Sequence, residues 1–308
     1  SGDGSTHQGI YDISMFNSMP NFTILSARNG KELEQLFCYA DKIKSPVVIR
    51  YPKNKTNINE NCLLVENVSW EIVQEGNELT ILTYGENVDY VLSSINNLFA
   101  FVILIIIAKK IGLFEDIPWN VRGISKGLLL GIPVLLFCLV QLSGILEATY
   151  DYSIAVNVFG VVAALIYCAA IALWEEFLCR GVILTNMLKK WGNSKGGIVK
   201  AVILSAFIFG CAHIITGFGG DWTNTAIQIV YASFMGLLFG VIYIKTESLA
   251  STIVLHFILN LTAYTMPYVM PNFQAMNPVT FILSIFGFVC LWVIETYVLI
   301  DDITKKLL

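Results

Sequence analysis

The sequence predicts an all-α polytopic membrane bundle of seven or eight transmembrane helices, preceded by a shorter α/β region. The first reason is composition: the 308 residues are 56% hydrophobic and 14% charged, with a mean hydropathy of +0.67. A soluble domain of this length is far less apolar. The second reason is an abrupt change at Leu98, after which apolar runs follow one another to the end of the chain.

Residues 1–97 have the pattern of an α/β region. Three short runs are strand-like, FTIL at 22–25, PVVIR at 46–50 and LTILTYG at 79–85, whereas 30–43 carries apolar residues at helical spacing. The chain begins Ser-Gly-Asp-Gly without an initiator methionine or a signal-peptide pattern. We therefore expect residue 1 not to be the biological start.

The second region contains a series of apolar runs. A spanning helix needs roughly 20 apolar residues, because the hydrocarbon core is about 30 Å thick and a helix rises about 1.5 Å per residue. The predicted spans are 91–108, 127–146, 154–173, 201–216, 224–244, 249–265 and 278–300. The stretch 174–188 is less apolar but has no Gly-Pro interruption, so we expect it to continue the third helix or to pack against it.

Basic residues occur in alternate connections between the predicted spans. They follow the first, third, fifth and last spans, as Lys109, Lys110, Arg122, Lys126, Lys189, Lys190, Lys195, Lys200, Lys245, Lys305 and Lys306. The positive-inside rule then predicts that these loops and the C-terminus are cytoplasmic and that the residues before the first span lie outside.

Three charged residues directly follow the third apolar run. A charged side chain at the bilayer centre costs about 2.5 to 3.5 kcal/mol on insertion scales, so such residues need partners or a function. Glu176 and Arg180 are four residues apart, the spacing at which they meet on one helical face. Glu175 is rotated by about 100° and remains available for another task.

Two further helices carry His213 and the pair His256 and Asn260, which again are four residues apart. A carboxylate and a histidine can hold and deprotonate a water molecule. A second histidine and an amide can donate hydrogen bonds to the oxyanion of a tetrahedral intermediate. Together with Glu175, these residues predict peptide hydrolysis without a covalent intermediate.

The same polar residues are also compatible with helix packing or with a metal site. Each histidine or asparagine alone is as well suited to an interhelical hydrogen bond, and Glu176 with Arg180 to a structural pair. Zinc is a further alternative, since two histidines and one or two glutamates match catalytic ligand types. The chain has no HExxH motif, and the ligands would come from three helices. We therefore expect no metal.

The three motifs together resemble a known family. EExxxR at 175–180, FxxxH at 209–213 and HxxxN at 256–260 occur in this order on successive predicted helices. Over about residues 98–308 the chain resembles the CPBP family, which contains type II CAAX prenyl endopeptidases and abortive-infection-like proteins. The resemblance implies a membrane protease with a glutamate-dependent, metal-free mechanism.

The same resemblance implies a role for each motif residue. Glu175 and His213 would activate water, and His256 and Asn260 would form the oxyanion site. The second glutamate and the arginine of the first motif would be structural.

The first region has a resemblance of its own. SGDGSTHQGIYDIS, SMPNFTIL and SPVVIRYPK resemble the pyrimidine-binding domain of 1-deoxy-D-xylulose-5-phosphate synthase, a transketolase-type enzyme that uses thiamine diphosphate. VEN and GNELTILTYG resemble the start of the C-terminal domain of that enzyme. The resemblance implies that Asp3, His7 and Arg50 are a remnant of a substrate-binding site.

These resemblances divide the chain into three parts. Residues 1–60 would be a partial pyrimidine-binding domain, 61–97 the truncated start of the transketolase C-terminal domain, and 98–308 the protease domain. The thiamine-diphosphate and Mg²⁺ domain is missing from this incomplete fragment, so we expect no binding of thiamine diphosphate and no synthase activity. The loop charges would place a cytosolic enzyme fragment outside the membrane. We therefore hypothesise that an accident of recombination, gene prediction or assembly joined the two regions near residues 91–98.

The sequence thus predicts an intramembrane endopeptidase of the bacterial plasma membrane, acting without a cofactor. Its partners would be the lipid bilayer and a peptide or protein substrate. The net charge of -4 and the lack of a basic run predict no nucleic-acid partner. The alternatives are a non-catalytic membrane immunity or scaffold protein, or a remnant of the synthase.

Overall fold

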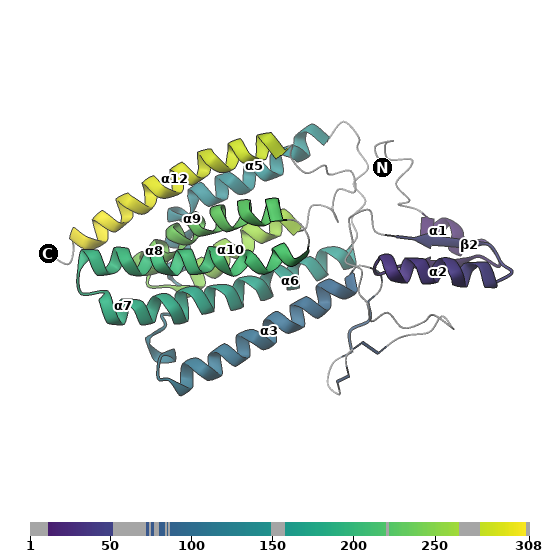
Figure 1. Ribbon diagram of the computed structural model, residues 1–308, viewed down its shortest axis with the longest axis horizontal. Coiled ribbons are helices and arrows are strands. Elements are labelled where there is room, and N and C mark those ends of the chain that lie inside the picture. The colour runs from purple at the N-terminus through teal and green to yellow at the C-terminus, as the bar shows by residue number, and fades with distance from the viewer. Residues whose placement is uncertain are drawn as a thin grey trace.

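The structure, a computed structural model, is mostly helical (Figure 1). It describes residues 12–51, 72, 73, 75, 76, 80–83, 85, 87–148, 158–219, 222–264 and 278–305. Figure 1 shows a small α/β region beyond one end of a long helical bundle, with the C-terminus at the opposite end.

The α/β region is built from four short elements. They are α1 (Asp12–Asn17), β1 (Thr23–Ser26), α2 (Gly30–Lys42) and β2 (Val47–Arg50). The two strands are parallel, with Thr23 opposite Val47 and Ser26 opposite Arg50. The strands predicted at 22–25 and 46–50 and the helix predicted at 30–43 are therefore confirmed.

Helix α2 covers the two strands. Its first turn is capped by Asn29, whose side-chain oxygen accepts from the backbone N–H groups of Lys31 and Glu32. Leu36 of α2 and Leu25 of β1 are buried in a small shared core. Amphipathic spacing thus places this helix on the sheet.

The third predicted strand, 79–85, is wrong for the part of it that the structure describes. Residues 80–83 carry no strand pairing. Strands β1 and β2 pair only with each other in the described sheet. A strand-like run needs a neighbouring strand edge for its backbone hydrogen bonds, and residues 80–83 do not pair with one.

The second region forms the helical bundle. Its main helices are α3 (Asn87–Lys110), α4 (Gly123–Leu130), α5 (Ile132–Ala148), α6 (Val158–Glu176), α7 (Thr185–Trp191), α8 (Lys195–Ala212), α9 (Trp222–Thr246), α10 (Leu249–Tyr264) and α12 (Pro278–Lys305). Every predicted span therefore contains a helix. Helix α3 begins before Leu98 and runs through it, so the change of composition lies inside one continuous helix.

Fewer helices meet the length and hydropathy expected of a membrane span. Among the described residues, four qualify, and the number is five if α4 and α5, bent by 64°, count as one span. Helix α10 is apolar but has only 16 residues. The predicted number of seven or eight spans is not confirmed by this criterion.

The stretch predicted at 174–188 continues the third helix. Between α6 and α7 lies η3 (Phe177–Leu184), a π-helical segment that joins them into one span, Val161–Trp191. The hydroxyl of Thr185 donates to the carbonyl oxygen of Arg180 at 3.0 Å, five residues earlier. Such π-helical turns are rare and are frequent at functional sites.

The ends of the helices that carry lysines meet at one end of the bundle. Lys195 Nζ, at the start of α8, lies 3.2 Å from Asp301 Oδ1, near the end of α12. Lys126 Nζ on α4 donates to the carbonyl oxygen of Lys245, near the end of α9, at 2.8 Å. Figure 1 shows that the α/β region lies beyond the other end. The alternation of basic loops along the sequence is therefore a segregation in space.

The helices pack closely inside and present apolar side chains outside. Gly127 on α4 lies against Ser251 on α10, where an added Cβ atom would be 2.3 Å from the serine Cβ. Helix α3 in contrast exposes Phe99, Val102 and Ile106. Such a surface is suited to contact with lipid chains rather than water.

Candidate active site

The polar residues of the three motifs come from three parts of the bundle. Helix α6 and segment η3 carry the first motif, the junction of α8 with the 3-10 segment η4 (His213–Gly219) carries the second, and α10 carries the third. All six motif residues lie in the described part of the chain, as Glu175, Glu176, Arg180, His213, His256 and Asn260.

Arg180 and Glu176 form a fully buried ion pair. Arg180 Nη1 lies 2.7 Å from Glu176 Oε1, and their side chains are 2% and 0% exposed. Arg180 Nη2 donates to the carbonyl oxygen of Gly236 at 3.3 Å. The guanidinium lies over the rings of Phe209 and Phe239, 4.5 and 5.4 Å from their centroids. The contact predicted from the spacing of four is present.

Glu176 also binds His256 on a different helix. Its Oε1 lies 2.9 Å from His256 Nδ1. An ionised carboxylate only accepts hydrogen bonds, so this contact places a proton on Nδ1. The other ring nitrogen, Nε2, lies 3.7 Å from Oε2 of Glu175. His256 is thus held between two adjacent carboxylates of α6.

His213 is anchored by the backbone of its own helix. Its Nδ1 lies 3.0 Å from the carbonyl oxygen of Phe209, one turn earlier, so Nδ1 is the donor. The Phe209 ring lies edge-on to both His213 and His256, with centroid distances of 5.2 and 5.9 Å. His213 Nε2 is therefore the ring nitrogen that remains for other contacts.

The structure records no ion pair between Glu175 and His213, both of which it describes. The ion-pair neighbour of Glu175 is His256 instead. The predicted water-activating pair is thus not in direct contact.

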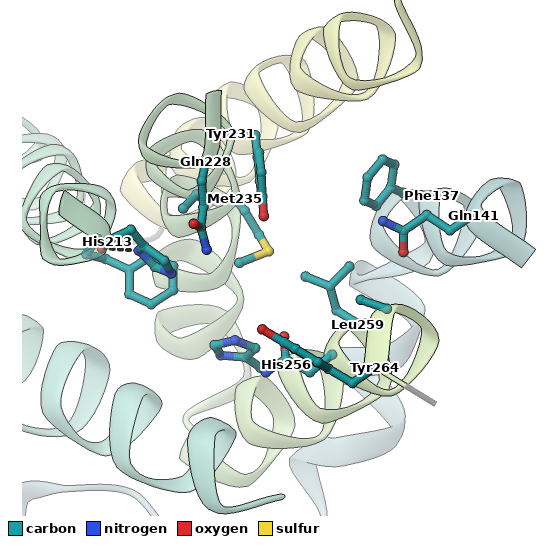
Figure 2. Close-up of a pocket in the computed structure, with 13 residues that line it drawn as sticks. Phe137, Gln141, His213, Gln228, Tyr231, Met235, His256, Leu259 and Tyr264 are labelled. Atoms are coloured by element: carbon teal, nitrogen blue, oxygen red, sulfur yellow. Dashed lines mark hydrogen bonds between the residues drawn. The ribbon is translucent and has the colours of Figure 1, made fainter. Parts of the chain in front are cut away.

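A cavity of about 110 Å³ opens beside these residues (Figure 2). Its lining includes His213, His256 and Asn260, together with polar side chains that sequence reasoning missed, Gln141, Gln228, Tyr231 and Tyr264. A polar residue inside a predicted apolar span is the signal that could have found the two glutamines.

Three side-chain atoms of the motif residues are buried without a hydrogen-bond partner among the described residues. They are Oε2 of Glu175, Oε2 of Glu176 and Nδ2 of Asn260, and of these residues Asn260 lines the cavity. Buried polar atoms are nearly always paired, and an unpaired one in a native structure calls for a physical reason such as a catalytic role. The two carboxylate oxygens are acceptors, and the amide nitrogen is a donor.

Of the three residues predicted as a synthase remnant, the structure describes one. Asp3 and His7 lie outside the described residues, and Arg50 ends strand β2 in the α/β region. In the part of the chain that the structure describes, no three His, Cys, Asp or Glu side chains are grouped so that they could hold a metal ion.

Two family models match parts of the chain. Residues 155–262 match the family model described as type II CAAX prenyl endopeptidase Rce1-like, and this range contains all six motif residues. Residues 1–58 match the family model of the transketolase pyrimidine-binding domain. No solved structure matches the chain.

The curated relatives resemble the first region. The 1-deoxy-D-xylulose-5-phosphate synthase of Clostridium botulinum (strain Alaska E43 / Type E3) is 39% identical over 93 residues, which cover 29% of this chain and 15% of that enzyme. The enzyme named 1-deoxy-D-xylulose-5-phosphate synthase in Shouchella clausii is 38% identical over 90 residues, 27% of this chain and 14% of that protein. The chain thus spans about 15% of the length of the curated relatives it matches.

The apolar helices and the family match indicate an integral membrane protein. Its helical region, over residues 155–262, matches the Rce1-like family of type II CAAX prenyl endopeptidases, and the region before it matches a transketolase pyrimidine-binding domain.

Proposed function

We propose that this protein is an intramembrane endopeptidase that hydrolyses peptide bonds with a water molecule activated by Glu175 and His213. The observation that carries the proposal is that Glu175 Oε2 and Asn260 Nδ2 are buried without a hydrogen-bond partner among the described residues. Glu176 Oε2 is also unpaired, but the other oxygen of that carboxylate is held by Arg180 and His256. An unpaired carboxylate oxygen can accept a proton, and an unpaired amide nitrogen can stabilise developing negative charge.

In the first step, a water molecule lies between Glu175 and His213. Glu175 Oε2 takes a proton from the water as the water oxygen attacks the peptide carbonyl carbon. Nε2 of His213 orients the water, because Nδ1 is engaged by the Phe209 carbonyl group. The protonated Glu175 then gives this proton to the amide nitrogen as the C–N bond breaks and the amine leaves.

The tetrahedral intermediate carries its negative charge on the former carbonyl oxygen. Asn260 Nδ2 donates to this oxygen, and so does His256 Nε2 when the ring is doubly protonated. Both residues line the cavity, and both lie on α10 one turn apart. The bond from His256 Nδ1 to Glu176 holds the ring in this orientation.

Glu176 and Arg180 position the site without touching substrate. The ion pair is fully buried, and its carboxylate also binds His256. This pair therefore connects the helix of the proposed base to the helix of the proposed oxyanion site.

We also propose an orientation in the bacterial plasma membrane, with seven crossings made by α3, the bent pair α4 and α5, α6 with α7, α8, α9, α10 and α12. The C-terminus and the lysine-bearing end are then cytoplasmic by the positive-inside rule. Residues 1–60 and 61–97 are proposed as synthase-derived segments without synthase activity, and residues 98–308 as the protease domain.

The experiment is a cleavage assay with the purified full chain in detergent. The substrates are a fluorogenic CAAX peptide that carries a farnesyl group and the same peptide without it. Glu175→Gln and His213→Ala should each lower kcat/KM by roughly 10²-fold or more, at unchanged expression and unfolding temperature. The matched controls are Glu115→Gln, an exposed glutamate at the lysine-bearing end, and His7→Ala, the one histidine of the sequence outside the three motifs.

Full activity of either site variant would refute the mechanism. If the wild-type protein cleaves neither peptide nor any member of a mixed peptide library, the function is better assigned to a non-catalytic immunity or scaffold protein.

A further inference from the structure

Two glutamines line the cavity and are not used by the proposed chemistry. Gln141 belongs to α5 and Gln228 to α9, both apolar helices. Figure 2 shows the two side chains on different sides of the cavity, with His256 below the space between them. Neither residue belongs to the three sequence motifs.

The amide of Gln141 is held by a threonine of α10. Thr262 Oγ1 lies 2.9 Å from Gln141 Oε1 and 2.8 Å from the carbonyl oxygen of Leu259. Thr262 is one turn from Leu259, which also lines the cavity. This contact joins α5 to the helix that carries His256.

The amide of Gln228 is held in a similar way by a threonine of η4. Thr216 Oγ1 lies 3.2 Å from Gln228 Oε1 and 2.8 Å from the carbonyl oxygen of His213. This contact joins α9 to the segment that begins with His213.

Each threonine therefore anchors one end of an amide and leaves hydrogen-bonding groups for the cavity. With the amide oxygen on the hydroxyl group, both N–H groups of the glutamine remain. With the amide turned over, one N–H group donates to the hydroxyl oxygen, and the other N–H group and the oxygen remain. In both orientations each glutamine keeps at least one N–H donor.

The chemistry of the cavity selects a neutral acceptor. None of its described lining residues is a lysine or an arginine. The nearby Arg180 is paired with Glu176, and the same carboxylate compensates the charge of a doubly protonated His256. An amide donor without an uncompensated cation beside it suits a peptide carbonyl oxygen better than a carboxylate, which needs charge compensation when it is desolvated.

We propose that Gln141 and Gln228 bind backbone carbonyl oxygens of the peptide substrate on the two sides of the scissile bond. This inference rests on the proposed endopeptidase function. The two amides hold an extended peptide across the cavity, so that the carbonyl group between them lies over His256 and Asn260. They bind the peptide backbone and do not contribute to selectivity for its side chains.

The test couples each glutamine to one substrate atom. The farnesylated CAAX peptide is prepared in versions that each carry one thioamide, since sulfur is a weaker hydrogen-bond acceptor than oxygen. Wild-type protein should lose roughly tenfold in kcat/KM when the thioamide falls at a contacted position. Gln228→Met and Gln141→Met should each lose a similar factor with the normal peptide, mainly through KM.

The decisive result is the combination. In Gln228→Met, a thioamide at one position should lower kcat/KM by less than about twofold. In Gln141→Met, the same weak response should occur for a thioamide at a different position, on the other side of the scissile bond. A purely structural role would lower activity but leave the thioamide response unchanged. Gln35→Met in α2 serves as the matched control. If a methionine variant does not fold, the Gln→Glu variant at the same site is used instead, because it keeps the shape of the side chain and its contact with threonine.

The inference is overturned if both variants keep the wild-type kcat/KM, or if they keep the full thioamide response, while the wild-type protein cleaves the peptide. In that case the endopeptidase proposal stands. A wild-type protein that cleaves no peptide overturns the proposed function and this inference with it.

Discussion

Glu176 Oε1 lies 2.9 Å from His256 Nδ1, although the two residues are 80 positions apart in the sequence. The same oxygen accepts from Arg180 Nη1 at 2.7 Å. One carboxylate oxygen thus serves an ion pair within its own helix and a hydrogen bond to a second helix. The geometry makes Glu176 the link between the first and third motifs.

Removing the arginine of this pair should destabilise the protein. Arg180→Met leaves a fully buried carboxylate without its cation and should cost roughly 3 to 5 kcal/mol. Thermal unfolding of the purified protein in detergent measures the effect. The control is the double variant Glu176→Gln with Arg180→Met, which removes both charges and should lose less than the sum of the single losses. Additive losses, within about 0.5 kcal/mol, would contradict a coupled pair.

A close approach between α4 and α10 should limit the size of residue 127. In Gly127→Ala the new Cβ atom would lie 2.3 Å from Ser251 Cβ, so one helix must shift. The expected loss is about 1 to 3 kcal/mol, measured by the unfolding temperature. Gly196→Ala is the matched control, since its Cβ atom meets nothing within 4 Å. A Gly127→Ala protein as stable as wild type would show that α4 and α10 do not pack in this way.

Chelation of metals should leave peptide cleavage unchanged. The proposed mechanism needs only Glu175, His213, His256 and Asn260. Among the described residues, no three His, Cys, Asp or Glu side chains are grouped so that they could hold a metal ion. The measurement is kcat/KM before and after treatment with EDTA and 1,10-phenanthroline, together with the zinc content of the purified protein. A zinc-dependent peptidase in the same buffer shows that chelation is effective. Activity that disappears and returns on addition of zinc would overturn this expectation.

The full chain should not bind thiamine diphosphate. It matches the synthase of Clostridium botulinum over 15% of that enzyme, and the family model that it matches in this region is the pyrimidine-binding domain alone. Isothermal titration with thiamine diphosphate and Mg²⁺ should give no saturable heat, whereas the intact synthase gives a binding isotherm. Saturable binding to this chain, abolished by His7→Ala, would contradict the prediction.

The α/β region shows which elements local sequence patterns predict correctly and which they do not. The helix at 30–43 was predictable from the spacing of its apolar residues, and the strands at 22–25 and 46–50 from their strand-like composition. The run at 79–85 has the same strand-like composition but remains unpaired over residues 80–83. Strand formation requires a partner edge, which composition does not reveal.

The sequence by itself determined the apolar helices, the segregation of lysines and the contact between Glu176 and Arg180. The helices and the contact depend on composition or spacing within one helix, so they arise whenever that helix forms. The segregation of lysines follows from their alternation between successive spans, since consecutive helices run in opposite directions. Only the tertiary structure placed His256 between Glu175 and Glu176, and only it brought Gln141 and Gln228 to the cavity. These relationships join side chains from different helices, whose packing distances and rotations no local spacing encodes.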